Sequence, residues 1–113
     1  AGMDRMAVYS AREEVVGLFH RVRLEAVGHG GADLVLQTFP PSVHLVVAGD
    51  TVAGGRLSAD PGLSMVLSRG RLNASLSFGP LGLGRVSSQT ILFRKGTEES
   101  VLVVSSLGRV VRR

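Results

Sequence analysis

Apolar residues recur at three- and four-residue steps in the first quarter of the chain. They fall on one face of a 3.6-residue repeat, which predicts an amphipathic helix. The run Gly28–Gly31, interrupted only by His29, ends this pattern, because glycine adopts the left-handed conformation that closes helices at little cost. The apolar stripe consists of Val15, Leu18, Phe19, Val22 and Ala26.

The start of this helix has two interpretations. Ser10 and Glu13 fit the S-x-x-E capping box, in which each side chain accepts a backbone N–H at the first helical turn. Alternatively, Met3, Met6 and Val8 extend the helix backwards, and Ser10 then lies inside a longer helix. The sequence alone leaves both open.

After Gly31 the period changes to two, which is typical of strands. The clearest case is 72–78, where Leu72, Ala74, Leu76 and Phe78 alternate with polar residues and predict a half-buried antiparallel strand. Six to eight short strands are expected in all. The segments with this character are 34–38, 43–47, 63–67, 72–78, 90–94, 101–104 and 108–112.

Turn signals separate these strands at intervals typical of antiparallel sheets and sandwiches. Pro40 and Pro41 end the first strand, since proline cannot donate to a central ladder. Segments 68–71 and 95–99 are short enough for hairpin turns, and 79–84 is a glycine-rich loop. There is no β-α-β alternation, which argues against a parallel nucleotide-binding sheet.

Length and composition indicate one folded domain. The chain has 113 residues, 44% of them hydrophobic, and a mean hydropathy of +0.27, enough to bury a core. It contains no cysteine, which excludes disulfides and thiolate chemistry. No apolar run approaches the roughly 18 residues of a membrane span. The chain begins Ala-Gly-Met, so we expect a segment upstream of it.

The chain is basic, with a formal net charge of +4 and a pI near 11.0. One interpretation is a polyanionic partner. The other is base composition of the genome, because Lys95 is the only lysine among 13 basic residues.

Arginines gather at the C-terminus, where Arg109, Arg112 and Arg113 occupy three of the last five positions. Together with Arg85 and Arg94 they could form a basic patch that contacts phosphates. Alternatively, they mark the exposed face of a last strand and protect an edge from aggregation. Aromatic residues for base stacking are not interleaved with them.

The sequence contains few candidates for catalytic or metal-binding residues. His20, His29 and His44 have no partner at metal-ligand spacing, and the carboxylates are scattered. The glycine-rich segment 79–85 lacks the Gly-Lys-Ser/Thr of a phosphate loop and is not followed by a helix pattern. We therefore expect no enzyme activity, no cofactor, no metal and no small-molecule substrate.

Three stretches, in order, resemble one known family. Residues 23–30 are similar to its helix-end pattern A-R-S-E-A-I-x-x-G, 78–82 to F-x-P-x-G, and 103–110 to the closing V-V-S-x-x-G-R-V. The family is that of the minor pseudopilins and minor pilins of the GspH/FimT type, and 40–70 carry no matching pattern. The matching residues are Arg23, Glu25, Ala26 and Gly30; Phe78, Pro80 and Gly82; and Val103, Val104, Ser105, Gly108, Arg109 and Val110.

The resemblance implies an α+β fold in which an N-terminal amphipathic helix packs on two antiparallel β-sheets, a pilin-like β-sandwich. Residues 1–31 would form the helix and its cap and 32–113 the β-rich head, within one domain. In such proteins the helix continues N-terminally into a hydrophobic segment. In such proteins that segment, which we expect upstream of residue 1, anchors the precursor in the inner membrane with a periplasmic head and later packs in the filament core.

The function implied by the resemblance is assembly without catalysis. The chain would be a subunit of a type IV pilus or a type II secretion pseudopilus, with other pilins at a filament tip and the inner membrane as its partners. The alternative is a DNA-binding minor pilin for DNA uptake, in which Arg109, Arg112 and Arg113 hold phosphates.

Overall fold

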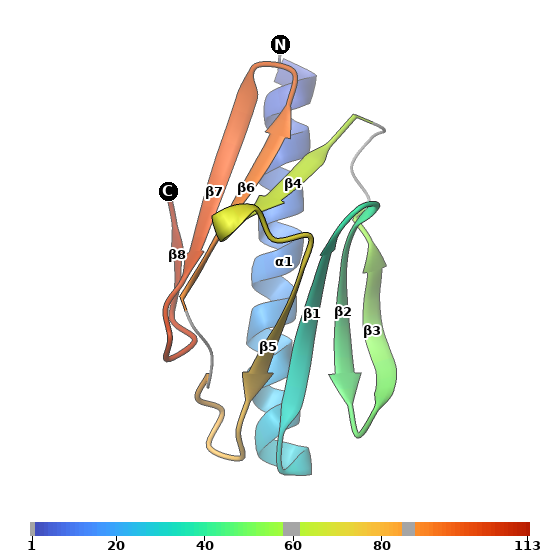
Figure 1. Ribbon diagram of the computed structural model, residues 1–113, viewed down its shortest axis with the longest axis vertical. Coiled ribbons are helices and arrows are strands. Elements are labelled where there is room, and N and C mark those ends of the chain that lie inside the picture. The colour runs from blue at the N-terminus through green and yellow to red at the C-terminus, as the bar shows by residue number, and fades with distance from the viewer. Residues whose placement is uncertain (1, 58–61, 85–87) are drawn as a thin grey trace.

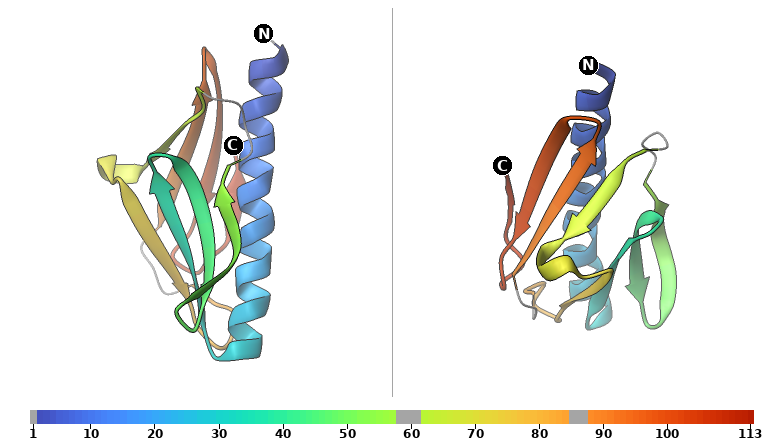
Figure 2. Two further views of the ribbon diagram at one scale, coloured as in Figure 1. Left: turned by 90° about the vertical axis from the view of Figure 1, so that its right-hand side faces the viewer. Right: turned by 45° about the horizontal axis from the view of Figure 1, so that its top comes forward.

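One long helix runs the length of the molecule. The computed structural model describes residues 2–57, 62–84 and 88–113. Helix α1 (Gly2–His29) spans 28 residues and follows the long axis of a molecule of 43 × 23 × 22 Å (Figure 1). Two antiparallel sheets lie on the same side of this helix (Figure 2).

The helix begins well before the predicted capping box. Ser10 and Glu13 lie inside α1, so the capping-box prediction is wrong, and the alternative in which Met3, Met6 and Val8 extend the helix is confirmed. The carboxylate of Glu13 binds an arginine from the end of the chain instead of a backbone N–H. The predicted stop at the glycine run is confirmed, because α1 ends one residue before Gly30.

The predicted apolar stripe faces the sheets. Leu18 is half-buried, and the remaining stripe residues are fully buried. The side chain of Ser100 reaches the helix from a sheet and donates a hydrogen bond of 2.6 Å to the carbonyl of Val8. The buried helix residues are Val8, Ala11, Val15, Val16, Phe19, Val22 and Ala26.

The strands form two four-stranded sheets, with the orders β3-β2-β1-β5 and β4-β6-β7-β8. Every pairing of these strands is antiparallel, and the buried side chains of both sheets join one core against α1. The bounds are β1 (Ala32–Thr38), β2 (Pro41–Val47), β3 (Asp50–Arg56), β4 (Ser64–Leu67), β5 (Asn73–Phe78), β6 (Gln89–Lys95), β7 (Glu98–Val104) and β8 (Val110–Arg112).

One predicted hairpin is confirmed and the other is wrong. Strands β6 and β7 pair directly across the turn after Lys95. Strands β4 and β5 do not pair: β4 lies against β6, and β5 lies against β1. The connection between them, a short 3₁₀ turn η1 (Ser68–Gly70), carries the chain from one sheet to the other. Leu72, predicted on the buried face of a strand, lies before β5 and is 72% exposed.

Strand β3 was not expected from the sequence. It forms the edge of its sheet, and all its residues are exposed or half-buried. Its centre is Gly54-Gly55, where an added Cβ at Gly54 would overlap the carbonyl oxygen of Val43. An edge strand without alternating large apolar residues leaves no period-two signal.

Candidate functional site

The three stretches that carry the family resemblance meet in space near the C-terminal end of α1. The first contact joins the helix to the loop after β5. Arg23 donates a hydrogen bond of 3.2 Å from Nε to the carbonyl of Gly82. Gly82 itself is buried, and a Cβ there would lie 3.3 Å from Cγ2 of Val27. The loop therefore approaches the helix as closely as a glycine allows.

The second contact is centred on Phe78, the last residue of β5, which is 2% exposed. Its ring meets that of Phe19 on α1 edge to face, with centroids 6.1 Å apart and planes at 72°. On another side, a Cβ added to Gly108 would lie 2.7 Å from Cε2 of Phe78. Phe78 thus links the helix to the closing stretch 103–110.

A tight turn completes this junction. Gly108 has φ +84° and donates its backbone N–H to the carbonyl of Ser105 at 2.8 Å. The Ser105 hydroxyl accepts the N–H of Arg109 at 3.0 Å. Gly84 donates to the carbonyl of Leu107 at 3.2 Å, so the loop after β5 and this turn touch through their backbones. We call this meeting of helix, loop and turn the motif junction.

Three exposed leucines surround the motif junction. Leu81 is 82% exposed, Leu83 48% and Leu107 65%. They line a shallow cavity of about 240 Å³ together with Gly79 and Gly84. We call these three leucines the leucine patch. Contiguous exposed apolar side chains of this kind mark interaction surfaces.

The remaining motif residues have structural surroundings. Ala26 is fully buried against the sheets, and Gly30 follows the helix with φ +77°. Glu25 lies within ion-pair distance of His29, at 3.2 Å, and of Arg21, at 3.8 Å. Pro80 is exposed in the loop before Gly82.

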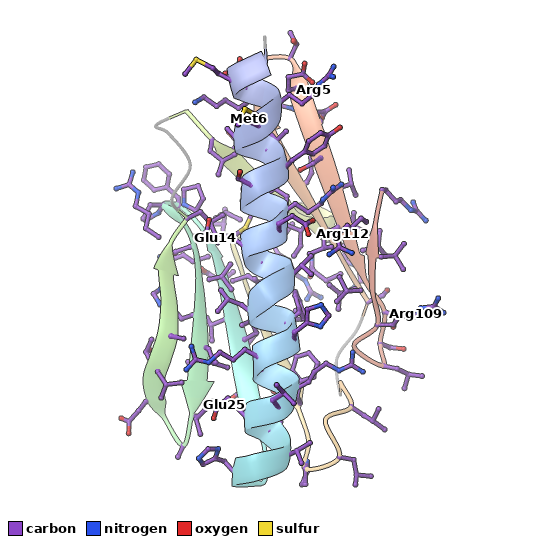
Figure 3. The ribbon with its side chains drawn as sticks, turned by 180° about the vertical axis from the view of Figure 1, so that it is seen from behind. Arg5, Met6, Glu14, Glu25, Arg109 and Arg112 are labelled. Atoms are coloured by element: carbon purple, nitrogen blue, oxygen red, sulfur yellow. The ribbon has the colours of Figure 1, made fainter. Side chains whose placement is uncertain are left out.

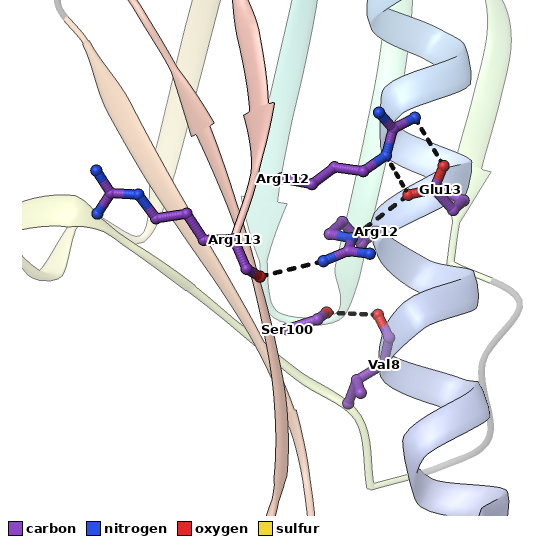
Figure 4. A network of polar contacts seen from close by, with 6 residues as sticks. All are labelled: Val8, Arg12, Glu13, Ser100, Arg112 and Arg113. Carbon is purple, nitrogen blue, oxygen red and sulfur yellow. Dashed lines mark hydrogen bonds and ion pairs between the residues drawn. The ribbon is translucent and has the colours of Figure 1, made fainter.

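The C-terminal arginines do not form one group. Arg112, at the end of β8, makes two parallel hydrogen bonds to Glu13 on α1, of 2.7 and 2.8 Å (Figure 4). These bonds, and the charge of the guanidinium, hold the pKa of Glu13 below its ordinary value of 4.5 and raise the pKa of Arg112. A two-pronged arginine–carboxylate pair of this type fixes orientation as well as charge.

Arg113 and Arg109 differ from Arg112. The backbone carbonyl of Arg113 accepts a hydrogen bond of 3.1 Å from Arg12, whose guanidinium also lies over the ring of Tyr9. Arg109 is exposed at the turn before β8, apart from Arg112 along the strand (Figure 3). Within the described residues neither the Arg109 nor the Arg113 side chain has a carboxylate partner. The side chain of Arg112 therefore ties β8 to α1, whereas the side chains of Arg109 and Arg113 are exposed.

Of the two other arginines of the predicted basic patch, the structure describes only Arg94. Arg94 donates to Glu99 at 2.7 Å within the β6–β7 pair, so its charge is neutralised there. Arg85 lies outside the described residues.

The outer face of α1 carries large apolar side chains that the sequence analysis did not assign to a surface. Met3 and Met6 are 74% and 69% exposed near one end, and Leu24 and Val27 are 75% and 58% exposed near the other. Figure 3 shows this face of the helix uncovered by either sheet. Their positions off the buried stripe were the available signal, because a helix that is apolar on more than one side has more than one packing face.

Possible metal ligands are scattered over the described residues. No group of three or more His, Cys, Asp or Glu side chains in that part of the chain is placed to hold a metal ion. The Nδ1 atom of His44 is buried without a hydrogen-bond partner, on a half-buried side chain in β2. Across the described ranges, no helix has both the length and the apolar character needed to cross a membrane.

Comparisons with known proteins bear on the fold. No family model and no curated protein matches the sequence. A crystal structure of the type IV minor pilin FimU from Pseudomonas aeruginosa PAO1 is similar with a TM-score of 0.76 at 17% identity, over 100% of this chain and 92% of that one. The chain has the fold of a type IV minor pilin. FimU in a second crystal form gives a TM-score of 0.67 at 20% identity, over 93% and 91% of the two chains.

The pilin fold accounts for the arrangement predicted from the resemblance. The α+β class, with one N-terminal helix packed on two antiparallel sheets, is confirmed. The division at residues 31 and 32 and the assignment to the GspH/FimT type stay predictions.

Proposed function

We propose that this chain is a non-catalytic minor pilin subunit that acts by assembling with other pilins in a filament. The observation that carries the proposal is the two-faced helix of a pilin fold. One face of α1 is buried under both sheets, while Met3, Met6, Leu24 and Val27 remain exposed on the outside. Exposed apolar side chains near both ends of one helix fit a helix that packs against neighbouring subunits.

The leucine patch supplies a second contact surface for the same role. Leu81 and Leu107 project their apolar atoms into solvent beside a glycine-lined backbone that is held by hydrogen bonds between the loop and the turn. A preorganised apolar surface loses little entropy on binding. The role places the chain in the bacterial cell envelope, with a hydrophobic N-terminal segment as its membrane anchor. The filament in this proposal is a type IV pilus or a type II secretion pseudopilus.

Cysteine cross-linking tests this proposal directly, because the chain has no cysteine of its own. Leu24→Cys, on the outer helix face, is introduced into the full-length protein in cells that produce the filament. The cells are treated with a maleimide–succinimidyl ester reagent, which joins the new thiol to an amine of a neighbouring protein. We expect adducts whose second component is identified by mass spectrometry as a pilin. Val52→Cys, 47% exposed on the edge strand β3, is the control and should give none. Absence of pilin adducts at position 24, or equal yields at both positions, contradicts the proposal.

A second candidate, DNA binding for uptake, is favoured by one observation. The guanidinium groups of Arg109 and Arg113 have no carboxylate partner in the described part of the chain, whereas Arg112 is held by Glu13. Phosphate contacts made by these groups would be independent of sequence and weaken steeply with salt. A gel shift of the wild type against Arg109→Ala/Arg113→Ala, which leaves the Arg112 pair intact, tests it. Absence of salt-sensitive binding by the wild type eliminates this candidate.

A further inference from the structure

The turn between the two sheets presents two arginines on a rigid support. Segment 68–71, which we call the arginine turn, contains Arg69 and Arg71, both exposed. It projects on the side of the molecule away from α1 (Figure 2). Arg69 has φ +61° and Gly70 φ +64°, the two positive values of a type I′ turn. A non-glycine residue with positive φ is uncommon and is kept where the surroundings hold it in place.

A small polar network holds this turn against β6. The hydroxyl of Ser68 accepts the backbone N–H of Thr90 at 2.6 Å and the side-chain amide of Gln89 at 2.9 Å. It also lies 3.2 Å from the carbonyl of Thr90, to which it donates. Gln89 is only 2% exposed, so this network is partly inside the protein. Satisfied buried networks rigidify the elements they join, and the arginine turn is therefore preorganised.

The charge of the arginine turn is not balanced by the rest of the described chain. Within the described residues, neither Arg69 nor Arg71 has an ion pair or a side-chain hydrogen bond. Of nine carboxylates in the sequence, all but Asp60 lie in the described ranges, and none is in the arginine turn or the β1–β2 turn. They lie on α1 (Asp4, Glu13, Glu14, Glu25), at the far end of β1 from Thr38 (Asp33), and at the starts of β3 (Asp50) and β7 (Glu98, Glu99).

Exposed apolar side chains lie on the residue after Arg71 and on the β1–β2 turn that contacts it. Thr38 donates from both its backbone N–H and its hydroxyl to the carbonyl of Leu72, each at 2.9 Å. This places the β1–β2 turn next to the residue that follows Arg71. Leu72 is 72% exposed and Phe39, which follows Thr38, is 88% exposed. Neither contributes to the core of its own chain.

We propose that the arginine turn, with Phe39 and Leu72, docks an acidic segment of another protein that also carries apolar side chains. The unpaired charges of Arg69 and Arg71 favour carboxylates in the partner. The exposed side chains of Phe39 and Leu72 favour apolar ones. Arginine and aromatic residues are the types enriched at protein interfaces, where they supply most of the binding energy. A single-stranded nucleic acid is less well matched, since it needs a groove and successive stacking rings.

The probe for this proposal is a fluorescein-labelled 12-residue peptide of Glu, Asp and Leu, followed by fluorescence anisotropy at 20 and 150 mM NaCl. We expect binding that weakens with salt, and a loss of about tenfold or more in Arg69→Gln/Arg71→Gln. The matched control, Arg109→Gln, removes another exposed and unpaired arginine and should bind like the wild type. Absence of wild-type binding at low salt, or an equal loss in both variants, overturns the proposal.

Two further variants separate charge from apolar contact and from folding. Phe39→Ser/Leu72→Ser should weaken binding by a similar factor at both salt concentrations, because apolar contacts are not screened. Arg69→Gly suits the positive φ at that position and should fold normally while still losing affinity. A 12-nucleotide DNA strand or anionic lipid vesicles that bind more tightly than the peptide, with the same dependence on Arg69 and Arg71, would also overturn the choice of a protein partner.

Discussion

Gly108 is the position at which the motif junction can be tested most sharply. Its backbone has φ +84°, and a Cβ there would lie 2.7 Å from the ring of Phe78 and 3.3 Å from the backbone nitrogen of Gly84. Gly108→Ala therefore imposes two separate costs. One is the left-handed backbone with a side chain, and the other is the collision with a buried aromatic ring that also packs on Phe19.

The chain contains a control that isolates the second cost. Gly49, in the turn between β2 and β3, has φ +85°, and a Cβ there meets nothing within 4 Å. Gly49→Ala should lose about 1 kcal/mol of unfolding free energy, the left-handed penalty less the entropy that alanine removes from the unfolded chain. Gly108→Ala should lose about 2–4 kcal/mol, because overpacking adds roughly 1–3 kcal/mol.

Urea unfolding of both variants and the wild type, followed by circular dichroism, gives the three free energies on one scale. The expected result is a Gly108→Ala loss that exceeds the Gly49→Ala loss by at least about 1 kcal/mol. Equal losses would show that Phe78 does not press on the closing turn, and the junction as described would be wrong.

Two other predictions concern the attachment of the sheets to α1. Ser100→Ala removes the buried hydrogen bond to the carbonyl of Val8 and should cost about 1 kcal/mol in urea unfolding, whereas Ser75→Ala, exposed on β5, should leave stability unchanged. Glu13→Gln should lower the melting temperature most near neutral pH. Arg112 depresses the pKa of Glu13, so the stabilisation is present above 4.5 and is lost as pH falls through the folded value. Melting temperatures of the two proteins that differ equally from pH 7 to pH 3 would contradict this.

The helix and most strands could be predicted because their signal is local. The buried stripe on α1 repeats every three or four residues whatever the helix packs against, and the turn after Lys95 joins strands that pair with each other. The partners of β4 and β5 could not be predicted this way. Residues 68–71 have the turn chemistry of a hairpin, but the choice of sheet depends on contacts with β6 and β1, which are distant in sequence.

In the candidate site, too, the residues could be selected from the sequence but their contacts could not. The resemblance selected the residues of the motif junction, yet the separations of 59 and 30 residues between the contacting pairs said nothing about contact. That Gly82 meets Arg23, and that Gly108 meets Phe78, depends on the tertiary fold. The basic C-terminus was visible in the sequence. The ion pair between Arg112 and Glu13 was not, because it joins residues that are 99 positions apart and meet only in the tertiary fold.

The central claim, that this chain is a filament subunit, is tested most directly by locating the full-length protein in cells that make the filament. Filaments sheared from the cell surface are purified and probed for the chain by immunoblot and quantitative mass spectrometry. We predict that the wild type is present there as a minor component, and that Leu81→Ser/Leu107→Ser, which changes two exposed side chains, is depleted although its cellular level is unchanged. A wild-type protein that stays entirely in the cell fraction while filaments are shed would contradict the account.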